Sequence, residues 1–586
     1  MRGWATPRLR PGDIVGHVHE WLRVRPSGLV ALALAIGAGA GAGAVAFRYL
    51  ILGFTLAFSG HRDYSAAGRA ANPSLPGLGI WFVVLAPVVG GLLYGPLIRA
   101  FAREARGHGV PEVMYAVSEE GGRIRPRVAV VKALASALCI GSGGSVGREG
   151  PIVQIGSALG STLGQVMHVP ESRLRVLVAC GAAGGISATF NAPIAGVFFA
   201  LELILRDFEA ESFGVVVLSS FAANIIGRAA FGSHPFLTLP AFQIRSPVEY
   251  PLYALLGLVA ALVGVAFIRM VYGAEDAADR LYRGPEWLRP AVGGLLLGLL
   301  LLAVPELYGV GYPPLENAIH GQYVVVFLLL LLAGKILASS LTIAIGGSGG
   351  VFAPSLFMGA MLGSAYGAGV HELLPGLTAP AGAYGLVGMG AVFAAAARAP
   401  ITAVIIVFEL TGDYRIVLPL MFAIALATGV SHILIPDTIY TLKLRRRGID
   451  VTRDRGANLM RQLRVADAMQ PVPEPLPAEL PLEDVVARLA DAPTDGLPVV
   501  GGGNGSRLVI TRRRLEQGIR DNTLDGTAGE LAEEVPTLTP DQTLEDALAT
   551  LLRADSGLPV AAADATTPVG WLTHLDVLRA YDTNGR

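Results

Sequence analysis

Long apolar runs, interrupted by glycine and proline, constrain this chain more than any other feature of its sequence. An apolar run of about twenty residues is long enough to span the hydrocarbon of a bilayer. Eight long apolar runs occur, at residues 28–47, 78–98, 176–201, 212–227, 250–268, 291–304, 323–341 and 416–436. Shorter apolar pieces at 128–140, 351–362 and 401–408 cannot cross alone. They indicate broken or re-entrant helices that line a cavity inside the protein.

The charged residues are distributed unevenly along the 586 residues. The last 146 residues hold 39 of the 91 Asp, Glu, Lys and Arg side chains, and the first 440 hold the other 52. Soluble proteins carry about 25% charged residues. The sequence therefore predicts a membrane part followed by a soluble tail, with a boundary near Tyr440. A net charge of −1 gives no basic surface for nucleic acid.

The two ends of the membrane part are basic. Arg8, Arg10, Arg23 and Arg25 precede the first apolar run, which is too long for a signal-peptide core, and four more basic residues lie within 443–447. By the positive-inside rule both ends are cytoplasmic, so the number of crossings is even. The only cysteines, Cys139 and Cys180, lie in apolar stretches and predict no metal site or disulfide framework.

The membrane part contains an internal repeat. Asn191-Ala-Pro-Ile-Ala-Gly-Val-Phe-Phe-Ala-Leu-Glu202 resembles Arg398-Ala-Pro-Ile-Thr-Ala-Val-Ile-Ile-Val-Phe-Glu409. Each copy follows a glycine-rich segment ending in proline at a similar distance, 42 residues from Pro151 to Pro193 and 46 from Pro354 to Pro400. Two halves with interrupted apolar segments at matching places are typical of transporters with a site at the repeat interface.

Three segments share one design, in which glycines precede a proline and an apolar run: Gly107-His-Gly-Val-Pro111, Gly147-Arg-Glu-Gly-Pro151 and Gly350-Val-Phe-Ala-Pro354. Proline is favoured in the first turn of a helix. The free N–H groups and the positive dipole end of such a helix bind anions. Together the segments predict a dehydrated anion held by partial charges. The alternative is that they are tight packing loops only.

These segments, with Asn191-Ala-Pro-Ile-Ala-Gly196 and Ile439-Tyr-Thr-Leu-Lys443, resemble the CLC family of chloride channels and proton/chloride exchangers. The tail resembles a pair of CBS domains, because helix-then-strand patterns repeat at 482–500 and 544–561. The resemblance implies an all-α membrane domain of about eighteen helices in two inverted halves, followed by an α/β CBS pair. It also implies a homodimer in the lipid bilayer, with one pathway for a small inorganic anion in each subunit.

The expected divisions are a cytoplasmic segment 1–27, a membrane domain 28–442, a linker 443–464 and CBS domains 465–522 and 523–586. We expect a bacterial inner (plasma) membrane protein whose N-terminus and tail are cytoplasmic.

The resemblance implies roles for individual residues. Glu149 is the expected gating glutamate, whose carboxylate competes with the anion; the alternative is a structural carboxylate paired with Arg148. Tyr440 is expected to donate its hydroxyl to the anion, and the alternative is an interfacial aromatic residue. Val351 and Phe352 are expected to contribute backbone N–H groups. The remaining expected anion-binding residues are His108, Gly109, Arg148 and Gly150.

Two departures from the family pattern affect the expected function. His108 stands where chloride-selective members usually carry serine, so it is expected either to donate to the anion or to add pH dependence on the cytoplasmic side. The alternative is a side chain that is turned away, with only the backbone used. Leu203 stands where exchangers carry an inner proton-transfer glutamate, and its neighbour Glu202 is structural or serves a rerouted water path. We therefore predict a channel-like, uncoupled mode, with a proton-coupled exchanger as the alternative.

In the tail, Gly570-Trp-Leu-Thr573-His-Leu-Asp576 fits the CBS nucleotide motif, with Thr573 facing phosphate and Asp576 facing ribose. The first copy has Thr511 but arginine at position 514 in place of the aspartate. This predicts binding of an adenine nucleotide (ATP, ADP or AMP), with a purely structural dimerisation module as the alternative. No other cofactor is expected.

Two rival classes fit less well. An intramembrane metalloprotease needs His-Glu-x-x-His, and His17-Val-His-Glu20 lacks the second histidine at that spacing, so we do not expect an enzyme. A divalent-cation channel would need several pore carboxylates. The intramembrane charges Lys132, Lys335, Arg398 and Glu409 are expected to be paired or at cavity edges, and His432 to be a packing residue.

Overall fold

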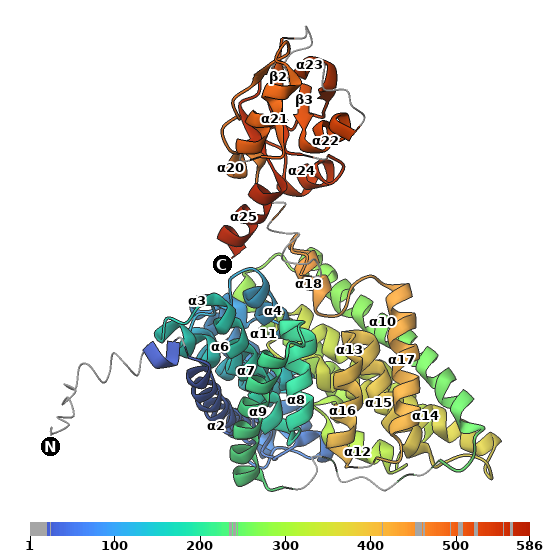
Figure 1. Cartoon of the computed structure of the whole chain (residues 1–586). Coiled ribbons are helices and arrows are strands. Elements are labelled where there is room, and N and C mark those ends of the chain that lie inside the picture. The colour runs from blue at the N-terminus through green and yellow to red at the C-terminus, as the bar shows by residue number, and fades with distance from the viewer. Residues whose placement is uncertain are drawn as a thin grey trace, which may run out of the picture. The chain divides into compact units, whose positions relative to one another are not determined.

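The computed structural model describes residues 20–23, 25–233, 237, 242, 244–412, 414–451, 460, 463–492, 494–501, 508–520, 526–554, 556–562 and 567–585. The chain forms two compact units, residues 1–451 and 452–586 (Figure 1). Within the described residues the first unit is helical and the second combines helices with short strands, as predicted. The finer domain boundaries stay predictions, and much of the segment 1–27 and part of the linker 443–464 lie outside the described residues.

The first unit is built from helices of very unequal length. They are α2 (Pro26–Ser59), α3 (Phe82–Phe101), α4 (Val110–Ser118), α5 (Arg127–Gly141), α6 (Glu149–Val166), α7 (Glu171–Phe190), α8 (Pro193–Phe199), α9 (Ala210–Phe231), α10 (Glu249–Leu281), α11 (Arg289–Ala303), α12 (Tyr312–Ile319), α13 (Val325–Ala344), α14 (Phe352–Leu373), α15 (Ala381–Ala397), α16 (Pro400–Thr411), α17 (Val417–Leu434) and α18 (Thr441–Arg445).

Seven helices in the described part are long and apolar enough to cross a membrane, and they coincide with seven of the eight predicted runs. The eighth run, 176–201, is not one span. Asn191 ends α7 in the left-handed conformation (φ 55°), and Pro193 starts α8. A residue in that conformation cannot continue a right-handed helix, and proline favours a new first turn. The π-helical segment Ala200–Leu205 continues α8.

The prediction of a short helix at 351–362 is also wrong, because α14 continues to Leu373. Small residues and His371 lower the hydropathy of its second half without breaking the helix. The other two short pieces correspond to short helices, the 15-residue α5 and the 12-residue α16.

Matching glycine pairs bring the helices of each half together. A Cβ on Gly156 of α6 would lie 2.1 Å from the Gly181 carbonyl of α7, and a Cβ on Gly359 of α14 would lie 2.2 Å from the Gly388 carbonyl of α15. Each first glycine follows its proline, Pro151 or Pro354, by five residues. The two halves therefore use the same close approach of helix backbones, which glycine permits because it has no side chain.

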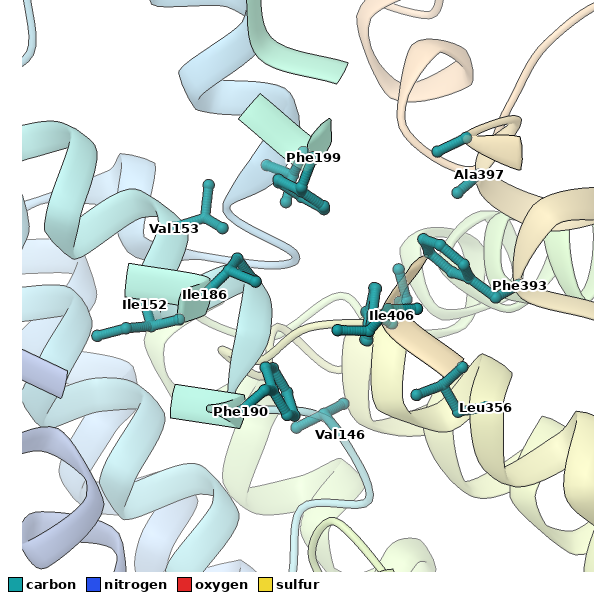
Figure 2. Packing of buried hydrophobic residues seen from close by; sticks show 14 of the residues in the cluster. Val146, Ile152, Val153, Ile186, Phe190, Phe199, Leu356, Phe393, Ala397 and Ile406 are labelled. Atoms are coloured by element: carbon teal, nitrogen blue, oxygen red, sulfur yellow. The ribbon is translucent and has the colours of Figure 1, made fainter. Parts of the chain in front are cut away.

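Apolar side chains of the two halves form one core. Figure 2 shows residues of α6, α7 and α8 beside residues of α14, α15 and α16. Phe352 packs at the centre, with its ring centroid 4.4 Å from that of Phe393 and 5.9 Å from that of Phe190. This core holds the starts of α6 and α14 in fixed positions.

The second unit contains two helix-and-strand copies. The described elements are α20 (Val465–Ala468), β1 (Leu476–Pro477), α21 (Leu482–Asp491), β2 (Gly496–Val500), β3 (Leu508–Thr511), α22 (Arg512–Arg520), α23 (Ala528–Leu531), β4 (Glu533–Glu534), α24 (Leu544–Leu551), β5 (Leu558–Val560), β6 (Gly570–Leu572) and α25 (His574–Gly585). One sheet has the order β1-β2-β3-β4 and the other pairs β5 with β6.

Segments of the tail cross between its two cores. Val465 and Ala468 pack in the core of the second copy with Leu544 and Val577. Ala528 packs in the core of the first copy, and β4 pairs with β3 of that copy. Each copy therefore supplies a segment that packs in the other copy, so the two copies are not independent modules.

Candidate functional site

The three glycine-proline segments of the membrane unit meet through backbone hydrogen bonds. Gly147 donates to the Gly350 carbonyl at 2.7 Å, and Gly350 donates back to the Gly147 carbonyl at 2.6 Å. Gly107 donates to the Gly347 carbonyl at 3.0 Å. Segments separated by more than 200 residues thus form one junction between the two halves.

Glycine is required at position 150, where two of these segments touch, because a Cβ there would lie 1.9 Å from the His108 carbonyl oxygen. A Cβ on Gly147 would lie 1.8 Å from Oε2 of the flexible Glu149 side chain, which would have to move. Gly107 and Gly109 adopt φ values of 76° and 86°, which glycine reaches without strain. The junction is therefore a backbone-lined cradle, which any larger side chain would fill.

Three helices begin at this junction. They are α4 at Val110, α6 at Glu149 and α14 at Phe352. The first N–H groups of a helix have no partner within it, and the helix dipole adds positive potential. Converging helix starts therefore attract negative charge to the junction.

Glu149 supplies the negative charge in this structure. Its side chain is 1% exposed. The Tyr312 hydroxyl donates to Oε1 at 3.0 Å, and the Ala353 N–H donates to Oε2 at 3.3 Å. The carboxylate also lies against Gly147 and Gly350. The carboxylate thus lies at the starts of α6 and α14, beside Tyr312 at the start of α12.

Two further predicted residues lie around the carboxylate. The Arg148 guanidinium lies over the ring of Tyr312 (5.2 Å to the centroid) and over Phe190 (5.5 Å). Tyr440 is buried at the start of α18, and its hydroxyl is near enough to interact electrostatically with Glu149. The structure therefore brings both residues to the same site as Glu149.

Val351 and Phe352 lie at the start of α14, where their N–H groups belong to the first turn. The Phe352 ring packs in the aromatic cluster of the core, so its side chain also supports the site. The sequence predicts a backbone N–H contribution from Phe352 and a smaller role for its side chain.

His108 is fully buried, and its ring meets Tyr272 edge-on, with centroids 6.3 Å apart. Within the described part of the chain neither ring nitrogen has a hydrogen-bond partner. Lys132 and Lys443 are close enough to interact electrostatically with it. A buried N–H without a partner is costly, so a bound anion would stabilise this side chain.

Glu202 and Glu409 cap each other's helices across the repeat. Glu202 accepts from the N–H groups of Ile401 (3.1 Å) and Thr402 (2.9 Å) at the start of α16. Glu409 accepts from Ile194 (3.0 Å) and Ala195 (2.7 Å) at the start of α8. This exchange favours the structural interpretation of Glu202. Its neighbour Leu203 is buried.

The buried cations bind backbone carbonyls. Lys132 donates to the carbonyls of Ala105 and Gly107, at 2.9 and 2.8 Å. Lys335 donates to those of Gly309 and Val310, both at 3.0 Å. Arg398 donates to carbonyls of residues 431–437. These side chains therefore fasten loops. His17 and His19, in the segment weighed against a metalloprotease, lie outside the described residues.

The tail has a cavity of about 740 Å³ that includes one of the predicted nucleotide motifs. Its lining residues are Gln470, Pro471, Pro473, Glu474, Leu476, Arg488, Asp491, Ala492, Thr494, Leu497, Trp571, Thr573, Leu575, Asp576 and Arg579. Asp576 Oδ2 accepts from the Thr573 hydroxyl (2.5 Å) and N–H (3.0 Å), so the pair caps α25. Thr511 is buried and its hydroxyl accepts from the Arg514 N–H.

Comparison with known proteins identifies the membrane unit. The model of the voltage gated chloride channel family matches residues 90–432, more than half of the chain. The chain belongs to this family. It is therefore an integral membrane protein that transports anions. A CBS domain model matches residues 528–583, the second copy of the tail.

Bacterial relatives of the family are similar over most of their length. A putative chloride channel protein ClcB-like from Ralstonia nicotianae is 37% identical over 377 residues, which cover 64% of this chain and 88% of that protein. The H(+)/Cl(-) exchange transporter ClcA of Vibrio parahaemolyticus is 37% identical over 360 residues, 60% of this chain and 76% of that protein.

Solved structures confirm the predicted CLC fold. A slow cyanobacterial Cl-/H+ antiporter matches with a TM-score of 0.63 and 24% identity, over 73% of this chain and 98% of that one. A eukaryotic CLC transporter matches with a TM-score of 0.63 and 21% identity, over 94% of this chain and 97% of that one. At these identities the likeness concerns the fold alone.

Sequence reasoning missed Tyr312, which donates to the expected gating glutamate of this CLC protein. A signal was present: Gly309-Val-Gly-Tyr-Pro313 has the same design as Gly107-His-Gly-Val-Pro111. Both loops place glycines at positive φ and are fastened by a buried lysine. The second loop is therefore the counterpart of the first in the other half of the repeat.

Proposed function

We propose that this protein exchanges chloride, or a similar small anion, for protons, and that Glu149 alternates between blocking the anion pathway and carrying a proton. Two observations support the proposal. A relative at 37% identity is named an H(+)/Cl(-) exchange transporter, and the Glu149 carboxylate lies buried at the starts of α6 and α14, beside Tyr312 at the start of α12. The position of Glu149 carries the proposal, because one buried carboxylate there can both block the anion pathway and carry a proton.

The position of the carboxylate explains why it competes with the anion. When Glu149 is ionised, it takes up the positive potential of the helix starts and the N–H of Ala353. When it is protonated, it loses most of that attraction and leaves the place to an anion. The N–H groups around Val351 and Phe352 and the Tyr440 hydroxyl are then the donors to the anion, with Arg148 adding positive charge beside it.

We propose exchange rather than the channel-like mode that Leu203 predicts, because similar proteins are named H(+)/Cl(-) exchange transporters. It requires an inner proton route that uses no side chain at position 203. Glu202 accepts three hydrogen bonds from Ile401 and Thr402, including one from the Thr402 hydroxyl at 2.7 Å. These bonds hold Glu202 at the start of α16, so we assign it no proton transfer.

The test compares wild-type protein with Glu149→Ala in proteoliposomes under a chloride gradient. We expect the wild type to move protons against the chloride flux. Without the carboxylate, chloride should move and protons should not. A variant that still couples the two fluxes would contradict the role of Glu149.

We also propose a homodimer in the bacterial plasma membrane, with the N-terminus and tail cytoplasmic. The basic residues at both ends of the membrane part support this orientation, and the family resemblance supports the dimer. Light scattering of the purified protein should give the mass of two chains. A mass of one chain would contradict the dimer.

For the tail we propose an adenine nucleotide in the cavity beside Thr573 and Asp576. The cavity has the volume of a small-molecule site, and Arg488 and Arg579 on its lining suit phosphate. Titration of the full-length protein with ATP, ADP and AMP tests the proposal, with Thr573→Ala expected to weaken binding. Thr550→Ala, on the exposed face of α24, is the matched control. Absence of binding by all three nucleotides would favour a structural module.

A further inference from the structure

The hydroxyl of Tyr312 donates to the carboxylate of Glu149 at 3.0 Å. We propose that Tyr312 is a positioning residue that holds the Glu149 carboxylate in the anion pathway and so weakens anion binding. This inference rests on the proposed role of Glu149. It adds a side chain from the second half of the repeat to a gate whose glutamate comes from the first half.

The loop that carries Tyr312 is held rigidly. Gly309 and Gly311 have φ values of 63° and 88°, and α12 starts at Tyr312 directly after them. Lys335, fully buried on α13, donates to the carbonyls of Gly309 and Val310 at 3.0 Å. A Cβ on Gly311 would lie 3.0 Å from the Phe357 ring, which itself packs against the Lys335 ammonium. Tyr312 thus starts from a fixed backbone.

The face of the Tyr312 ring also contacts the side chain of Arg148. The Arg148 guanidinium lies 5.2 Å from its centroid, a distance at which a cation attracts the face of an aromatic ring. Arg148 precedes Glu149 directly, so this contact and the hydroxyl bond fix the ring against both residues. The hydroxyl therefore reaches the carboxylate in one defined geometry.

A hydrogen bond that stabilises the Glu149 carboxylate in its blocking position should lower the apparent affinity for the anion. The anion binds only when the carboxylate is out of the way, so its apparent dissociation constant rises with the population of the blocked state. The Tyr312 hydroxyl donates to the carboxylate in that state. Removing the hydroxyl should therefore tighten chloride binding by about tenfold, which equals about 1.4 kcal/mol.

The experiment measures chloride binding by calorimetry on the full-length purified protein and four variants. Tyr312→Phe removes only the hydroxyl and keeps the ring beside Arg148. Tyr366→Phe is the matched control, because it removes a hydroxyl that donates at 3.0 Å to the Leu252 carbonyl, remote from the gate. Glu149→Ala and the double variant Y312F/E149A complete a thermodynamic cycle.

We expect Y312F to bind chloride about tenfold more tightly than wild type, Y366F to match wild type, and Y312F to have no effect in the E149A background. Unchanged binding in Y312F, with tighter binding in E149A, would overturn this inference and leave the proposed gate intact. An equal effect of Y312F with and without Glu149 would also overturn it. Unchanged binding in E149A would instead refute the gate itself. If Y312F alone fails to fold, the pair E149A and Y312F/E149A still measures any effect of the hydroxyl that bypasses Glu149, and Y312L, which has no side-chain donor, supplies the test with Glu149 present.

Discussion

Replacing Gly147 by alanine should displace the gating carboxylate without any change to Glu149 itself. The added Cβ would lie 1.8 Å from Glu149 Oε2, whereas ordinary contact begins at 3.4 Å. The oxygen must therefore retreat by about 1.6 Å (3.4 − 1.8). Because it belongs to the end of a flexible side chain, the carboxylate can move while the backbone junction stays in place.

That retreat breaks at least one hydrogen bond of the blocked state. The bonds from Ala353 at 3.3 Å and Tyr312 at 3.0 Å cannot both survive it. A hydrogen bond to a charged group contributes about 1.5–3 kcal/mol. Destabilising the blocked state by the lower figure tightens apparent chloride binding by about tenfold. Transport should also depend less on pH, because the ionised carboxylate no longer blocks the pathway.

The assay is chloride calorimetry together with flux in proteoliposomes between pH 4.5 and 7.5. Gly53→Ala is the matched control, since a Cβ at this position of α2 meets no atom within 4 Å. A folded G147A protein with the chloride affinity and pH dependence of wild type would refute the placement of the carboxylate in the glycine cradle.

Three further variants test the surrounding side chains. His108→Ser removes a buried ring whose nitrogens have no hydrogen-bond partner in the described part of the chain, and it should change the ratio of chloride to nitrate affinity by about fivefold, as the loss of one hydrogen bond of about 1 kcal/mol would. An unchanged ratio would mean that only the backbone of residue 108 is used. Glu202→Ala removes the cap of α16 and should lower the free energy of thermal unfolding by about 1 kcal/mol, without changing the ratio of protons to chloride transported. Loss of proton coupling at unchanged stability would give Glu202 a role in proton transfer. Lys335→Met frees the 309–311 loop and should tighten chloride binding as Y312F does, measured by the same calorimetry; weaker binding would contradict the positioning of Tyr312 by this lysine.

The parts of the site that the sequence predicted are those made by the backbone. Glycine and proline at fixed spacing indicate turns and helix starts directly, so the sequence predicts the segments around Gly109, Gly150 and Val351. The repeat begins at Asn191 and Arg398, and the structure adds that both residues end helices at positive φ.

What the sequence did not predict depends on side chains that meet across the fold. The Tyr312 hydroxyl reaches Glu149 only because loops separated by about 160 residues converge. The sequence predicts that Lys335 is paired or at a cavity edge, but it does not predict the backbone carbonyls of Gly309 and Val310 that this lysine binds. The division of the run 176–201 was hidden because Asn191 and Pro193 lie within continuous apolar sequence, where hydropathy outweighs their signal.

Proton coupling is the most direct test of the proposed exchange. Proteoliposomes loaded with high chloride, at equal pH inside and outside, are clamped near zero voltage with a potassium ionophore, and external pH is followed as chloride leaves. The account predicts that protons enter as chloride leaves, so that the external medium becomes alkaline, and that Glu149→Ala abolishes this change while chloride still flows. Chloride efflux by the wild-type protein at constant external pH would contradict exchange and favour the channel-like mode.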